Sequence, residues 1–133
     1  MAFGVATVLT NLERAMVADR IRATPATYTT AFKYIALGTG ATGAARTAAA
    51  ADTALSTEVE TRTAGTESIV TTTLTGDTYQ VSGTVTMTAP RAIDEGGLFD
   101  ASSSGHMAVS WTQAVDNFAS GDSYQVTVKV QFL

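Results

Sequence analysis

The sequence predicts a mainly β protein, an antiparallel β-sandwich or jelly-roll-like barrel with one N-terminal amphipathic helix. Threonine occurs 24 times, mostly in alternating stretches, and β-branched side chains suit the outer face of a sheet. Two segments alternate regularly between apolar and polar residues, and turn signals separate five or six short strand-like runs. Short strands at this spacing are typical of sandwiches and barrels.

The chain length of 133 residues predicts one domain over residues 1–133, with residues 1–24 as an N-terminal arm and helix. Its core is expected to be thin, because Val, Ile, Leu and Phe together account for only 28 residues. A small domain buries a smaller share of its surface, so contacts with neighbouring subunits are expected to add to its stability.

The N-terminal segment departs from the β pattern. An apolar stripe at helical spacing contains Val5, Val8, Leu9, Leu12 and Met16. Thr10 and Glu13 have the spacing of a capping box, and Pro25 lies beyond the last turn, so a helix is predicted from about Thr10 to Arg22. Two interpretations remain open: the segment lies on its own sheet, or it docks on a neighbouring subunit.

Three apolar residues of the arm are the candidate partner-binding residues, namely Phe3, Val5 and Val8. They stand ahead of or at the start of the predicted helix, where few intramolecular partners are expected. The alternative is that they complete the core of their own domain.

Phe32 to Leu37 is predicted to form a buried strand that ends at Gly38-Thr39-Gly40. The Gly/Ala/Thr-rich stretch from Ala41 to Ala51 has little to bury and is expected to be an exposed, mobile loop. A short turn or helix is expected from Thr53 to Glu58.

A hairpin is predicted from Ser68 to Thr75 and from Thr78 to Thr88, joined through Gly76-Asp77. Its second arm places Tyr79, Val81, Val85 and Met87 on an inward face, with Gly83 as a candidate bulge.

Beyond Pro90, strand character is predicted at Gly97 to Asp100 and at Met107 to Thr112, with a turn at Ser102 to Gly105 between them. The final strand shows the alternation most plainly, with one face formed by Tyr124, Val126, Val128, Val130 and Phe132.

Composition excludes several classes of function. With a net charge of -4 and eight scattered Lys and Arg residues, no basic patch for nucleic acid or anionic membranes is expected. The absence of cysteine excludes disulfides and thiolate chemistry. No signal sequence or apolar run of membrane-spanning length is recognisable, so a soluble, unexported product is expected.

Candidate catalytic and metal-binding groups are sparse. His106 is the only histidine, and a Ser/His pair would draw on Ser102 to Ser104 with Asp100 orienting the ring; ordinary turn residues explain the same run. The acidic residues Asp94, Glu95 and Asp100 suggest a hard-cation site, but they lack the spacing of a calcium loop, and Gly96-Gly97 suggests a turn. The sequence therefore predicts a protein without catalytic, metal-binding or cofactor-binding residues.

Two further features have a structural and a functional interpretation. The run from Gly38 to Gly43 looks like a glycine-rich phosphate loop but lacks its Lys and Ser/Thr, so a flexible loop is favoured. Trp111 is a candidate platform for a sugar ring, although its strand neighbours favour a place in the core.

Three segments, in this order, resemble a pattern in small structural proteins of tailed phages. They are Tyr34-Ile35-Ala36-Leu37-Gly38-Thr39-Gly40, then Asp52-Thr53-Ala54-Leu55-Ser56-Thr57-Glu58-Val59, then Glu95-Gly96-Gly97-Leu98-Phe99-Asp100 with Gly105-His106-Met107. The resemblance covers roughly Phe32 to Leu133 and concerns the accessory virion proteins, either capsid decoration (cement) proteins or tail-associated proteins.

This resemblance implies a non-enzymatic virion protein, assembled in the host cytoplasm, that binds the outer shell and bridges capsid subunits. Its partners would be the major capsid protein and neighbouring copies of itself, for example in symmetric trimers, with no nucleic acid or membrane. A tail or tail-fibre component with receptor contact is the first alternative, and a carbohydrate-binding β-sandwich module is the second.

Overall fold

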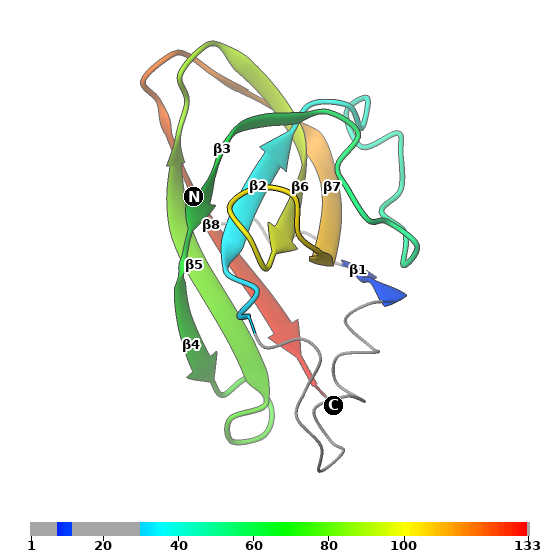
Figure 1. Cartoon of the computed structure of the whole chain (residues 1–133), viewed down its shortest axis with the longest axis vertical. Helices are drawn as coiled ribbons and strands as arrows, with labels where there is room; N and C mark the ends of the chain where they lie inside the picture. Colours follow the sequence, from blue (N-terminus) through cyan, green and yellow to red (C-terminus); the bar gives the residue numbers. More distant parts are fainter. Residues whose placement is uncertain (1–7, 12–29, 133) are drawn as a thin grey trace.

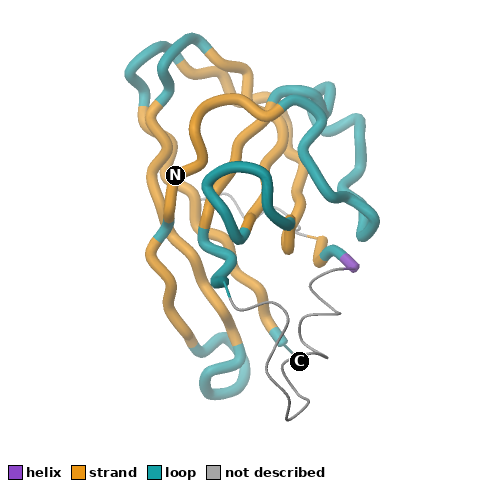
Figure 2. Tube along the Cα trace, in the orientation of Figure 1, coloured by secondary structure: helices purple, strands orange, loops and turns teal. Residues whose placement is uncertain are grey.

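The computed structural model describes residues 8–11 and 30–132, and its strands form two antiparallel sheets (Figures 1 and 2). The strands are β1 (Val8–Leu9), β2 (Tyr34–Gly38), β3 (Glu58–Ala64), β4 (Thr66–Val70), β5 (Thr78–Thr86), β6 (Arg91–Phe99), β7 (Met107–Phe118) and β8 (Ser123–Gln131). The mainly β prediction is confirmed.

The five-stranded sheet has the order β1-β7-β6-β2-β3, and the three-stranded sheet has the order β4-β5-β8. The chain changes sheets between β3 and β4, between β5 and β6, and between β7 and β8. Only Gly65 separates β3 from β4, and its N–H donates to the carbonyl of Lys33 (2.8 Å). A Cβ at Gly65 would overlap the side chain of Val81, which explains why glycine occupies this corner.

The inner faces of the two sheets share one apolar core, an arrangement that is compatible with a sandwich. Ile35 and Ile93 from one sheet and Val81 from the other have no exposed surface. The alternation in the sequence correctly predicted burial of Val81 and Val85 in β5, of Met87 just beyond it, and of most of the predicted row of β8, whereas Tyr79 is half-buried. Phe132 departs from the prediction because it lies beyond the end of β8 and is 43% exposed.

The β4–β5 hairpin exists, but its connection is wider than a Gly76-Asp77 turn. The carboxylate of Asp77 accepts hydrogen bonds from the backbone N–H groups of Thr72, Thr73 and Leu74 (2.8–3.0 Å). These donors, led by that of Leu74, hold the pKa of Asp77 far below its usual range. Asp77 therefore organises a loop over residues 71–77 rather than a two-residue turn.

Three other local predictions were wrong. Gly83 lies in an unbroken β5–β8 register; a Cβ there would come within 2.9 Å of the Ile35 side chain, so close packing and not a bulge explains it. Gly96-Gly97 lies inside β6 instead of in a turn. Residues 53–57 contain no helix, and the strand β3 that follows was not predicted.

The predicted helix from Thr10 to Arg22 lies outside the described residues, apart from Thr10 and Asn11. Thr10 is buried; its N–H donates to the carbonyl of Ala108 (3.0 Å) and its hydroxyl to that of Met107 (2.8 Å). Just before it, β1 pairs with β7, with Val8 opposite Ser110 and Leu9 opposite Val109. The described start of the chain is thus an edge strand of the five-stranded sheet.

Candidate functional site

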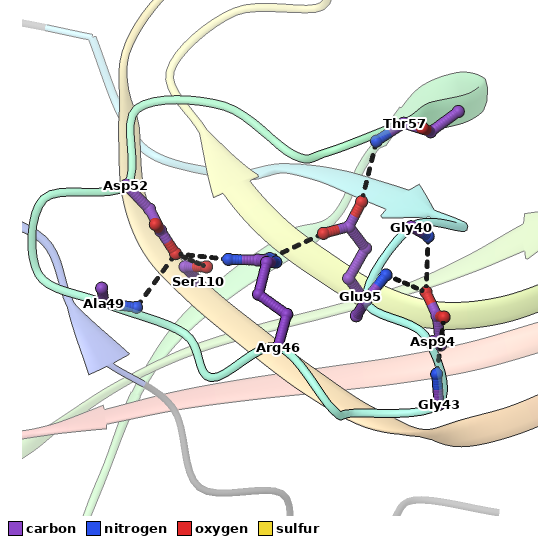
Figure 3. Close-up of polar contacts among 10 residues, drawn as sticks. Gly40, Gly43, Arg46, Ala49, Asp52, Thr57, Asp94, Glu95 and Ser110 are labelled. Carbon is purple, nitrogen blue, oxygen red and sulfur yellow. Dashed lines mark hydrogen bonds and ion pairs between the residues drawn. The ribbon is translucent and has the colours of Figure 1, made fainter.

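Charged side chains of the β2–β3 loop, residues 39–57, meet two buried carboxylates of β6 (Figure 3). Its two ends meet, since the N–H of Thr39 donates to the carbonyl of Thr57 (2.9 Å). Compact surface loops with adjacent ends are often functional, which makes this loop the first place to look for a site.

Two consecutive carboxylates of β6 reach this loop. They lie beside an irregularity whose extra residues are in β7, since Ile93 pairs with Asp116 but Glu95 pairs with Thr112. Both side chains contact the β2–β3 loop and both residues are buried. The sequence Asp94-Glu95-Gly96-Gly97 resembles a turn, but it is part of β6, and its two carboxylates accept hydrogen bonds from the β2–β3 loop.

Asp94 is surrounded by backbone donors of the glycine-rich run. Its carboxylate accepts hydrogen bonds from the N–H groups of Gly40 (2.8 Å), Ala41 (3.0 Å) and Gly43 (3.0 Å). Residues 42–44 all have positive φ, which curves the loop around the anion. The run from Gly38 to Gly43 therefore binds a carboxylate of its own chain, where a phosphate loop would bind a ligand.

This arrangement makes the loop sensitive to acid. Burial disfavours the charged form of Asp94, but the loop N–H donors outweigh burial and hold the pKa of the carboxyl below its usual range. A depressed pKa stabilises the fold above the unfolded value of about 4, and this stabilisation is lost as the pH falls through the folded value.

We expect Asp94→Asn to lower the free energy of unfolding at pH 7 by about 2 kcal/mol, because its amide cannot replace an anion that accepts several N–H groups. Below about pH 4 the difference from the parent protein should shrink, since the carboxyl becomes protonated first in the unfolded chain and, at a lower pH, in the folded protein. Urea unfolding at a series of pH values measures both effects. A difference that stays constant down to the acid limit would contradict this assignment.

Glu95 forms the second anchor of the loop. Its side chain is fully buried, and its carboxylate accepts from the guanidinium of Arg46 (2.6 Å) and from the N–H of Thr57 (3.0 Å). Arg46 also contacts Asp52 (3.1 Å), which in turn accepts from the hydroxyl of Ser110 on β7 (2.9 Å). The loop is thus bound to two interior strands of the five-stranded sheet, the central strand β6 and its neighbour β7.

The directions of the pKa shifts of Asp52 and Arg46 agree with these contacts. Burial opposes the charge of Asp52, but the N–H of Ala49, the hydroxyl of Ser110 and the Arg46 guanidinium together hold its pKa below the usual range. The pKa of Arg46 is raised against the cost of burial by its two carboxylate partners. Arg46 and Asp52 therefore carry charge at neutral pH.

A small second apolar cluster lies beside these charges. It consists of Ala36, Leu55, Phe99 and Met107, with Tyr34 packed against it. Every member belongs to one of the three segments that carry the resemblance described above. Those segments therefore meet in space, on the face of the sheet that the β2–β3 loop covers.

The expectation of an exposed loop with nothing to bury holds only for its outer residues. Thr42 to Ala45 are exposed, whereas Ala41 and Ala48 are buried. Arg46 and Asp52, the two groups that fix the loop, were not singled out in the sequence. The one sequence feature that could have indicated this ion pair is that Arg46 stands in an alanine-rich run, six residues before Asp52.

The acidic residues proposed for a cation are bound within the chain. Asp94 and Glu95 hold the loop, while Asp100 accepts from the backbone N–H of His106 (2.7 Å) and pairs with its Nδ1 (2.9 Å). Over residues 8–11 and 30–132, no three His, Cys, Asp or Glu side chains gather as a metal site would require.

The turn at Ser102 to Gly105 is a structured loop. Arg62 of β3 donates to the carbonyls of Ala101 (3.0 Å) and Ser104 (2.6 Å), and its guanidinium lies 3.5 Å from the centre of the Phe99 ring. Together with the Asp100–His106 pair, these contacts explain the turn residues without a catalytic role.

Trp111 is only 4% exposed and belongs to the central core. Its ring lies against Gly96 on the neighbouring strand, and its Nε1 donates to Gln113 (3.2 Å). The favoured interpretation, a place in the core, is confirmed, and a sugar ring has no access to this indole.

A shallow cleft of about 280 Å³ lies between Asn11, Ala50 to Thr53 and the end of the 100–106 turn. Its most polar wall residue, Asp52, is already bound to Arg46 and Ser110. Of its other polar wall residues, His106 pairs with Asp100 and the hydroxyl of Thr10 donates to the carbonyl of Met107.

Comparison with protein-family models, curated proteins and solved structures finds no match to this chain. Within the described ranges, the structure contains no helix with the length and apolar character to cross a membrane. Of the three proposed partner-binding residues, Phe3 and Val5 lie outside the described residues, and Val8 is half-buried in β1.

Proposed function

We propose that this chain is a non-enzymatic virion structural protein, and specifically a capsid decoration protein that binds the outer shell and bridges capsid subunits. The observation that carries the proposal is the convergence of the three resembling segments into one structural unit, the β2–β3 loop with its small apolar cluster.

The way the charges are used also supports a structural role. The loop is held by the carboxylates of Glu95, Asp94 and Asp52, which gives a rigid surface. None of these three carboxylates is therefore directed at a substrate. We propose a sandwich of the two sheets as the scaffold and the exposed outer part of the loop as a surface for neighbouring subunits.

The proposed partners are the major capsid protein and further copies of this chain, arranged about a local symmetry axis. Phe3, Val5 and Val8 remain the proposed partner contacts. A weak contact repeated over a shell gains strength from high local concentration, so a small interface is sufficient.

The test is to incubate the purified protein with capsids that lack it and to localise it by cryo-electron microscopy. We expect density that repeats over the icosahedral shell. Density confined to the tail would replace decoration with a tail role, and absence from both structures would refute the virion proposal.

The carbohydrate-binding alternative has lost its main candidate group, because Trp111 is buried and Tyr124 is only 8% exposed. A glycan array with specific hits, together with no binding to capsids, would restore it.

A further inference from the structure

The tip of the β2–β3 loop lies beside an exposed part of β7. Thr42 to Ala45 are exposed in the loop, and Ala114 and Val115 are exposed in the strand. A Cβ added to Gly43 would lie 3.4 Å from a γ-methyl group of Val115, so this side chain lies directly against the loop tip. These residues, Thr42 to Ala45 with Ala114 and Val115, are called the loop-tip surface below.

Asp94 fixes both parts of the loop-tip surface. In the β6–β7 ladder, β7 has three residues, 113–115, at the point where β6 has only Asp94. On the loop side, the carboxylate of Asp94 accepts hydrogen bonds from the N–H groups of Gly40, Ala41 and Gly43 (Figure 3). The surface is therefore organised before a partner binds, which lowers the entropy cost of binding.

The loop tip carries side chains at two positions where glycine would be less strained. Thr42 and Ala44 have positive φ, 53° and 70°, a conformation that a Cβ disfavours and that glycine adopts freely. Glycine at both positions would allow the same curve around Asp94. Strain of this kind is concentrated at functional sites. Because both residues are also exposed, their side chains are candidates for contact with a partner.

We propose that the loop-tip surface is a second contact site of this chain and that it binds an uncharged, apolar patch on a subunit of the capsid shell. None of its residues is charged, and the centres of protein interfaces are depleted of charged residues. The inference rests on the decoration function proposed above. It adds to the contacts of the arm, because a protein that bridges subunits needs surfaces for two neighbours.

The size of the loop-tip surface favours a shell subunit over a second copy of this chain. A stable pairwise interface uses about 20–30 residues on each side, and the loop-tip surface is much smaller. A contact of this size becomes effective when a second site on the same molecule binds the same particle. A shell of repeated subunits offers both sites, whereas a pair of free copies would have only the small contact.

The first test measures binding of the purified protein to capsids that lack it, by sedimentation over a series of concentrations. Val115→Glu places an unpaired charge in the surface and should weaken binding by about tenfold or more. The matched control is Ile69→Glu, which adds the same charge at an exposed apolar position of β4 in the other sheet. The control should bind as the parent protein does.

The second test separates contact with a partner from a role in the fold. The double variant Thr42→Gly with Ala44→Gly relieves the backbone strain, so its thermal midpoint should equal or exceed that of the parent, while its binding should weaken by about tenfold. Ser104→Gly is the matched control, because it relieves the same strain (φ 53°) in the turn at 102–105. Its binding should remain unchanged.

The other outcomes overturn the inference in distinguishable ways. If either surface variant binds with the parent's affinity, the loop-tip surface is not the contact, and the decoration function stands. If the parent protein binds no shell, the decoration function fails and this inference fails with it. A parent dimer in solution that Val115→Glu dissociates would identify a second copy as the occupant. Should Val115→Glu not fold, the glycine variant decides alone; a lower thermal midpoint there would assign both side chains to the fold.

Discussion

Replacing Arg46 by methionine is expected to lower the free energy of unfolding by about 3 kcal/mol, because removal of one partner leaves a buried carboxylate without its counter-charge. Glu95 has no exposed side-chain surface, and it would retain the N–H of Thr57 as its one hydrogen bond among those described. Asp52 would lose the same cation. Urea denaturation followed by the fluorescence of the single tryptophan measures the loss.

Two further variants separate this effect from the loss of any surface ion pair. Lys33 and Glu67 form an exposed pair at 3.6 Å, so Lys33→Met should cost less than about 1 kcal/mol. In the double variant Arg46→Met with Glu95→Gln, part of the stability should return, since the fully buried side chain at position 95 is then neutral. The buried Nε of Arg46 has no hydrogen-bond partner among the described residues, which is a cost that the double variant removes. Equal losses for the Arg46 and Lys33 variants would contradict the structural role of the cluster.

The strands with strict alternation were the most predictable part of the fold. In β5 and β8, one face meets the core and the other meets solvent, so burial leaves a period of two in the sequence. β3 was missed because it is an edge strand with charged residues: Arg62 binds Glu58 and the carbonyl of Ser104, and Glu60 accepts from Arg91 of β6. No apolar period marks such a strand.

The candidate site was harder to predict, because its residues are distant in sequence. Glu95 and Arg46 are separated by 49 positions, and they meet only because the β2–β3 loop returns over the sheet. The glycine-rich run looked like a phosphate loop, but a flexible loop was favoured; its N–H groups bind Asp94, at a separation of 51 to 54 positions. Sequence patterns indicate what a segment can bind, and topology decides what it meets.

Gly96 is another residue whose surroundings depend on the topology, and its substitution has the second large expected effect on stability. It was interpreted as a turn residue, yet it lies opposite Trp111 in the β6–β7 ladder, and the indole occupies the space where a side chain would be. A Cβ at Gly96 would overlap the ring, with Cη2 only 2.8 Å away. Trp111 is confined within the core, so neither group has room to move.

We expect Gly96→Ala to destabilise the protein by about 3 kcal/mol, the upper part of the range for overpacked cores. Gly121→Ala is the matched control: it adds the same methyl group where nothing lies within 4 Å, so only its positive φ opposes it, at about 1 kcal/mol. A smaller ring should relieve the overlap, and therefore the losses of Gly96→Ala and Trp111→Phe should combine to less than their sum. Strictly additive losses in urea denaturation would show that the glycine is required for its backbone and not for the space that the indole fills.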